Sequence, residues 1–119
     1  MLEAPLVTLY LARRDAYAEF LSAADAESQV AWFRSDGRYK EDAEAIAAVD
    51  TAYAATRAKF NVIDVESVGP IKEARAVLEQ LQAMHKDGGK SPDWHDFKQA
   101  REEFVKSAGD FLRGMVGEK

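Results

Sequence analysis

Two arginines of this chain, Arg13 and Arg101, stand where apolar side chains would be expected. Arg101 lies between Phe97 and Phe104 at helical spacing, and Arg13 lies four residues before Tyr17. A guanidinium matches a carboxylate or phosphate in two places. If their helices are neighbours, Arg13, Tyr17 and Arg101 would line a pocket for a small anionic or amphipathic ligand. The alternative is that each arginine lays its stem along apolar surface and pairs with an acid, for which Asp15, Asp50 and Glu102 are the candidates.

A second candidate site consists of aromatic residues beside the apolar face of their helix. Trp32 and Phe33 fall outside the helical spacing of that face, and Tyr39 follows after a turn. Large aromatic side chains on a surface are typical of protein–protein interfaces. The alternative is that they close one end of the core by packing on the β-branched side chains of the segment 62–65.

No complete motif for catalysis or metal binding is present. His85 and His95 are preceded at three positions by Gln82 and Pro92 rather than by the Glu of a helical metal motif, and the chain has no cysteine. The run 89–91 matches the closing half of a phosphate-binding loop, but Pro92 follows it and is typical of a helix start. We therefore predict no catalytic residues, no metal, no cofactor and no enzymatic activity.

The spacing of apolar residues predicts four amphipathic helices. The first runs from Pro5 to about Ser35, and Ser35-Asp36-Gly37 supplies the turn. The second runs from about residue 39 or 40 to 61, the third and shorter one begins at Pro70, and the fourth follows Ser91-Pro92-Asp93. The β-branched segment 62–69 between the second and third helices predicts an extended or irregular crossover.

Short connections between long helices favour antiparallel neighbours. The chain therefore predicts an all-α fold, an up-down-up-down four-helix bundle that forms one domain over residues 1–119. The alternative is a long helical hairpin that completes its core only by dimerising. Either architecture has to bury one apolar face of each helix.

Charge and hydropathy limit the class of partner. The formal net charge is −5, with both signs interspersed, which argues against a nucleic-acid partner. No apolar stretch is long enough to span a bilayer, and the last helix has a mixed polar face, so we expect no membrane binding. The amino terminus does not match a secretory signal, and cytoplasm is the expected location.

Three short segments carry a resemblance to known proteins. They are residues 13–21 followed by 23–25, residues 68–70 leading into an alanine-containing helix, and residues 92–94 leading into the last helix. In these segments the chain resembles small, all-helical, uncharacterised proteins of actinobacteria. The resemblance implies a helical bundle of bacterial origin and brings no activity, cofactor or site residue with it.

Together these observations predict a non-enzymatic helical bundle that acts through protein–protein contacts, as a homodimer or as an accessory subunit. The alternative function is the binding of a small anionic or amphipathic ligand in a pocket between the first and fourth helices.

Overall fold

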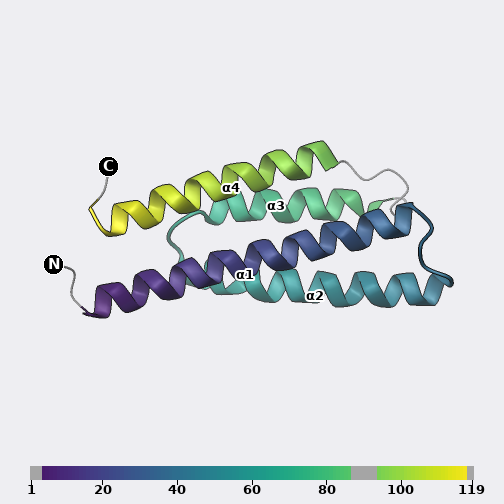
Figure 1. Ribbon diagram of the computed structural model, residues 1–119, viewed down its shortest axis with the longest axis horizontal. Coiled ribbons are helices and arrows are strands. Elements are labelled where there is room, and N and C mark those ends of the chain that lie inside the picture. The colour runs from purple at the N-terminus through teal and green to yellow at the C-terminus, as the bar shows by residue number, and fades with distance from the viewer. Residues whose placement is uncertain (1–3, 87–93, 118–119) are drawn as a thin grey trace.

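The protein contains four long helices and no strand within residues 4–86 and 94–117, the part of the chain that the computed structural model describes. The helices are α1 (Ala4–Ser35), α2 (Asp42–Glu66), α3 (Ile71–Met84) and α4 (Trp94–Met115), and Figure 1 shows the chain reversing direction between successive helices. This confirms the prediction of an all-α four-helix fold. The predicted helix start at Ser91–Asp93 and the run 89–91 lie outside the described residues.

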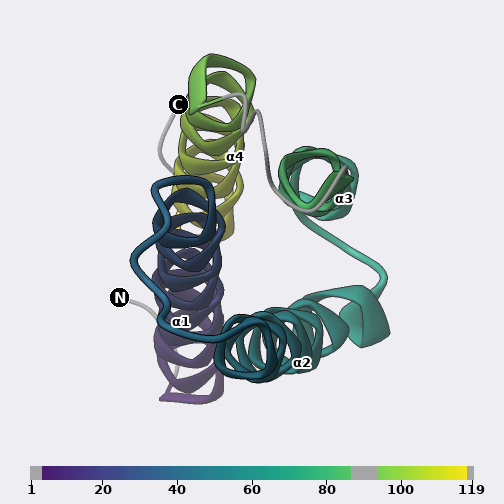
Figure 2. The ribbon, with the colours of Figure 1, turned by 90° about the vertical axis from the view of Figure 1, so that its right-hand side faces the viewer.

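Three ion pairs and one hydrogen bond show that α1 runs antiparallel to both α2 and α4. As residue numbers rise along α1, the numbers of the partner residues fall along each of the other two helices. On α2, Arg13 pairs with Glu66 and Glu19 pairs with Lys59; on α4, Arg13 contacts Met115 and Asp25 pairs with Arg101. Figure 2, seen along the bundle, places α1 between α2 and α4, with α3 beside α4 and also in contact with α1.

The predicted bounds of α1 are correct. Pro5 occupies the first turn, where its missing N–H costs no helical hydrogen bond, and the helix continues through Ala24 to Ser35. Gly37 then adopts a left-handed conformation with φ of +71° and lets the chain turn. The backbone N–H of Arg38 donates to the carbonyl of Phe33, which caps the helix end.

The predicted crossover over residues 62–69 is wrong in extent, because α2 continues to Glu66. The non-helical connection comprises only residues 67–70, in which Ser67 and Gly69 have left-handed φ values of 58° and 83°. β-branched residues lower helix propensity by well under 1 kcal/mol each, and tertiary packing overrides so small a preference. Here Ile63 is buried in the core, so the helix is retained through it.

The core is built from aromatic side chains of α1 and α4 and aliphatic side chains of α3. Phe20 and Phe104 are fully buried and meet edge to face with ring centroids 5.1 Å apart. Leu81 and Val77 close the core from α3. Small buried residues at the helix contacts, such as Ala24, let the backbones approach closely.

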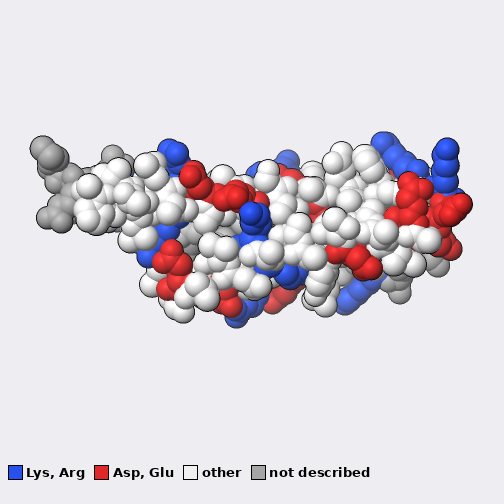
Figure 3. All heavy atoms as spheres, turned by 90° about the horizontal axis from the view of Figure 1, so that it is seen from below, with Lys and Arg blue, Asp and Glu red and all other residues white. Residues whose placement is uncertain are grey.

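The first turns of α1 extend beyond α2, whose last residue, Glu66, pairs with Arg13. Residues 4–12 carry no charge, and on the face drawn in Figure 3 the described atoms at this end of the molecule are neither blue nor red. Its exposed large apolar side chains are Val7, Leu9 and Leu11. No helix in the described part of the chain is both long and apolar enough to cross a membrane.

Candidate functional site

The structure separates the two arginines that were predicted to share a pocket. Arg13 pairs with Glu66 at 2.9 Å, whereas Arg101 forms two hydrogen bonds of 2.7 and 2.8 Å to Asp25. Asp25 lies twelve residues beyond Arg13, or about 18 Å along α1. Because α1 and α4 are antiparallel, Arg13 is level with Met115 and not with Arg101. The two-arginine pocket is therefore wrong. Each arginine pairs with an acid, as the alternative states, but the ion-pair partners are Glu66 and Asp25 and not the expected Asp15, Asp50 or Glu102.

Tyr17, the third residue of that predicted pocket, belongs to the core. Its side chain is buried and meets the ring of Phe104 edge to face at 5.9 Å between centroids. Burial raises the pKa of Tyr17, since the phenolate would be poorly solvated there. Tyr17 therefore contributes to packing near Arg13, and it is not among the described residues that line a groove with Arg101.

A groove of about 900 Å³ does lie between α1 and α4, near the carboxyl end of α1. We call it the α1–α4 groove. Its two ends differ: one is aromatic, and the other is lined by small and charged side chains. The aromatic end contains Trp32, Phe33, Trp94 and Phe97.

Two half-exposed tryptophans mark the aromatic end. Trp32 is 46 % exposed and Trp94 is 50 % exposed. Asp25 and Arg101 are paired across the groove, and Trp32 lies seven residues beyond Asp25 while Trp94 lies seven residues before Arg101. The two tryptophans are therefore level with each other on antiparallel helices. The ring of Trp94 packs on the buried ring of Phe97, with centroids 5.5 Å apart.

The alternative that Trp32 and Phe33 pack on the segment 62–65 is wrong. That segment ends next to Glu66, which pairs with Arg13 at the opposite end of α1. Phe33 is half-buried and instead lies under the guanidinium of Arg38, 4.6 Å from the ring centroid. Its neighbour Trp32 faces the groove.

Tyr39, the third predicted interface residue, lies elsewhere. It is half-buried in the connection between α1 and α2 and is not among the described residues that line the α1–α4 groove. The structure thus brings Trp32 and Phe33 together with Trp94 and leaves Tyr39 apart.

The charged end of the groove is electrically balanced. Arg101 and Asp25 neutralise each other, and the hydrogen bonds to Asp25 raise the pKa of Arg101 so that it keeps its charge. Lys98 and Glu102 line the same groove, four residues apart on α4. Neither forms an ion pair within the described residues. Lys98 and Glu102 therefore add one exposed positive and one exposed negative charge to the groove, and the charge of Glu102 also helps to raise the pKa of Arg101.

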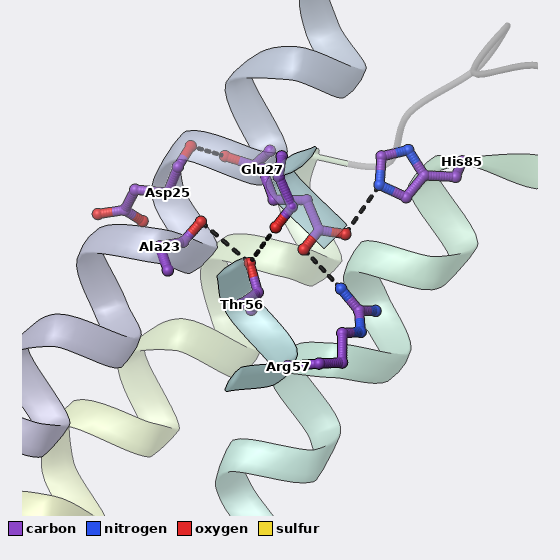
Figure 4. Close-up of polar contacts among 8 residues, drawn as sticks. Ala23, Asp25, Glu27, Thr56, Arg57 and His85 are labelled. Atoms are coloured by element: carbon purple, nitrogen blue, oxygen red, sulfur yellow. Dashed lines mark hydrogen bonds and ion pairs between the residues drawn. The ribbon is translucent and has the colours of Figure 1, made fainter. Parts of the chain in front are cut away.

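A buried ionic cluster, absent from the sequence prediction, joins α1, α2 and α3 (Figure 4). Glu27 is fully buried; its Oε1 accepts a hydrogen bond of 2.6 Å from Arg57, and its Oε2 lies 2.9 Å from Nε2 of His85. Nearby, the hydroxyl of Thr56 donates to the carbonyl of Ala23 on α1. We call Glu27, Arg57 and His85 the Glu27 cluster.

The charge state of Glu27 follows from these contacts. Burial raises the pKa of Glu27, but hydrogen bonds from His85 and Arg57 outweigh that effect and leave the pKa below its ordinary value. The carboxylate is therefore ionised at neutral pH. Glu27 and its two partners are not among the described residues that line the α1–α4 groove, and the cluster connects α1, α2 and the end of α3.

Within the described residues, no three side chains of the His, Cys, Asp or Glu type gather in a way that could hold a metal ion. His95 is exposed near the start of α4, and His85 belongs to the Glu27 cluster.

No protein-family model, curated protein or solved structure matches this chain. The resemblance to actinobacterial helical proteins therefore stays a prediction, and the α1–α4 groove carries the functional argument.

Proposed function

We propose that this protein is a non-enzymatic helical bundle that binds another polypeptide through the α1–α4 groove. The observation that carries the proposal is the pair of half-exposed tryptophans, Trp32 and Trp94, level with each other at one end of the groove. Roughly 100 Å² of each indole is open to water, and burying it would contribute about 2.5 kcal/mol per residue. Tryptophan is also the residue type most enriched among the energetically dominant positions of interfaces.

The dimensions of the groove support a polypeptide occupant. On α1 its lining extends from Ser22 to Phe33, a distance of about 16 Å or three helical turns. Two antiparallel helices with a hollow between them offer a packing site for the side chains of a further helix. The occupant can be a second copy of this chain or a different protein to which it is an accessory subunit.

The proposal can be tested by placing a photoreactive amino acid, p-benzoylphenylalanine, at Gln29 in the groove. Illumination of cells that make this protein should give cross-linked polypeptides, and these should disappear when Trp32→Ala and Trp94→Ala are added. The matched control carries the photoreactive group at Val65, which is 84 % exposed and remote from the groove. Cross-linking at Gln29 no stronger than at Val65 would overturn the proposal, provided that circular dichroism shows an unchanged helix content.

A second candidate function is the binding of a small amphipathic molecule in the same groove. The volume of about 900 Å³ lies within the range of small-molecule sites, and Lys98 and Arg101 line the same groove as its aromatic side chains. Arg13 and Tyr17 take no part in this version, for the reasons given above. Native mass spectrometry of gently purified protein should then show a retained small mass, which Gln29→Trp should displace by filling the groove. A bare protein mass under gentle conditions would count against this candidate.

A further inference from the structure

We infer that Met115 is an oxidation site for hydroperoxides, and that the guanidinium of Arg13 is placed to receive the sulfoxide that forms there. This inference concerns the opposite end of α1 from the groove and does not depend on the proposed function. It rests on the difference in exposure between Met115 and Met84, and on the way in which Arg13 divides its N–H groups between two helices.

The two methionines that end helices differ in their access to solvent. Met115 is the last residue of α4 and is only partly buried. Met84 is the last residue of α3, but it lies in the core and is 1 % exposed. Oxidation of a methionine requires contact between its sulfur and the oxidant, so susceptibility follows exposure. A hydroperoxide should therefore oxidise Met115 in the folded protein, and Met84 only when the bundle opens.

The reaction is a two-electron oxidation of the thioether. A lone pair of Sδ attacks the OH oxygen of the hydroperoxide, so that an S–O bond forms and the O–O bond breaks. The proton of the attacked oxygen passes through solvent to the leaving oxygen, and hydrogen peroxide is thereby reduced to water. The product, methionine sulfoxide, is polar, and reductases can convert it back to methionine. Its new oxygen is a hydrogen-bond acceptor, which destabilises an apolar environment unless a donor is at hand.

Arg13 supplies that donor. Its Nη1 donates to Sδ of Met115 at 3.4 Å, whereas its Nε and Nη2 donate to the two carboxylate oxygens of Glu66 at 3.4 and 2.9 Å. The guanidinium also lies over the ring of Phe111, 5.3 Å from the centroid. The hydrogen bonds to Glu66 raise the pKa of Arg13, so the guanidinium keeps its charge. An oxygen added to Sδ would therefore meet a charged N–H group that the ion pair with Glu66 does not use.

The same contacts predict how oxidation affects the fold. Through Arg13, the last residues of α2 and α4 are both bound to α1. A thioether sulfur is a weak acceptor, and the sulfoxide oxygen would replace it with a charge-assisted hydrogen bond to Nη1. Oxidation of Met115 should therefore leave the fold intact and hold the end of α4 to α1 at least as firmly as before.

Treatment of the full chain with hydrogen peroxide provides the test, with peptide mass spectrometry and thermal unfolding as the measurements. Met115 should gain one oxygen about tenfold or more faster than Met84. The unfolding midpoint of the oxidised wild type should equal or exceed that of the untreated protein, and the midpoint of Met115→Leu should not change on treatment. In Arg13→Leu the sulfoxide has no guanidinium donor, so treatment should lower the midpoint by about 4 °C or more. The matched control Glu66→Ala loses the same ion pair but keeps the donor, and treatment should not lower its midpoint.

Two results would overturn the inference. Equal rates of oxidation at Met115 and Met84 in the wild type would show that Met115 is not a selective site, and this comparison does not depend on the folding of any variant. The same response to peroxide in the wild type and in Arg13→Leu would show that Arg13 does not receive the sulfoxide. The cross-linking experiment at Gln29 concerns the groove alone, so its failure would alter neither result.

Discussion

Replacement of Glu27 by alanine tests whether the Glu27 cluster holds the bundle together. The carboxylate is fully buried and takes part in two hydrogen bonds, of 2.6 Å with Arg57 and 2.9 Å with His85. Hydrogen bonds to a buried charge contribute about 1.5 kcal/mol each, and the lost methylene adds about 0.8 kcal/mol. The sum is about 4 kcal/mol. Breaking a buried ion pair costs about 3–5 kcal/mol. The loss expected for Glu27→Ala stays below the upper end of that range because the side chain of Arg57 is 19 % exposed and can be hydrated in the variant.

The chain supplies a matched control for this prediction. Glu19 also lies on α1 and pairs with a base on α2, Lys59, but both side chains are about half exposed. Such a pair contributes less than about 1 kcal/mol, so Glu19→Ala should change stability little. Guanidinium unfolding followed by circular dichroism gives the free energy of unfolding of both variants. Equal losses for Glu27→Ala and Glu19→Ala would refute the argument that burial and charge-assisted hydrogen bonds set the magnitude.

Three further predictions concern pH, backbone strain and the groove. In the folded protein the pKa of Glu27 is below its ordinary value of 4.5. The stability that its charge contributes is therefore fully present above pH 4.5 and is lost as the pH falls through the folded-state pKa. The unfolding free energies of the wild type and of Glu27→Gln should converge in acid and diverge at neutral pH. Gly69→Ala should lower the free energy of unfolding by about 2–3 kcal/mol, because Gly69 has a φ of +83° and the new Cβ would lie 2.7 Å from the Tyr17 hydroxyl. The control Gly37→Ala, with open space around it, should lower the free energy of unfolding by only about 1 kcal/mol. Equal shifts in the denaturant midpoint of the two variants would contradict this prediction. Arg101→Leu should change the free energy of unfolding by no more than about 1 kcal/mol, because the ion pair of Arg101 with Asp25 is partly exposed. A loss above about 2 kcal/mol would show that the fold requires this ion pair.

The number and type of helices could be predicted because each helix repeats apolar residues at its own period. That signal is local, and punctuation by Pro5 and Gly37 is local as well. The end of α2 could not be predicted in the same way. The β-branched residues of segment 62–65 indicate a helix end, but the burial of Ile63 against other helices decides the outcome.

The candidate site could not be predicted in the same way, because it depends on which residues of neighbouring helices lie at the same height. The spacing of residues within one helix does not contain that information. Arg13 and Arg101 look equivalent in sequence, yet antiparallel packing places them at different heights along α1. The sequence predicts only that Trp94 belongs to the apolar face of the last helix. That Trp94 lies opposite Trp32 follows from the structure alone. Glu27 continued the apolar spacing of the first helix, which was a signal of a buried acid, but its partners came from two other helices.

The uncharged end of α1 has a consequence for how the molecule opens. Beyond Arg13, residues 4–12 have neither α2 beside them nor an ion pair to anchor them. Regions with few packed neighbours open locally at a lower free energy than the whole molecule. In hydrogen exchange, the amides of these first turns should therefore exchange through local fraying, whereas those near Phe20 and Glu27 should exchange only when the entire bundle unfolds. The continuous helix α1 would then consist of two parts: one that unfolds locally, and one that unfolds only together with the whole bundle.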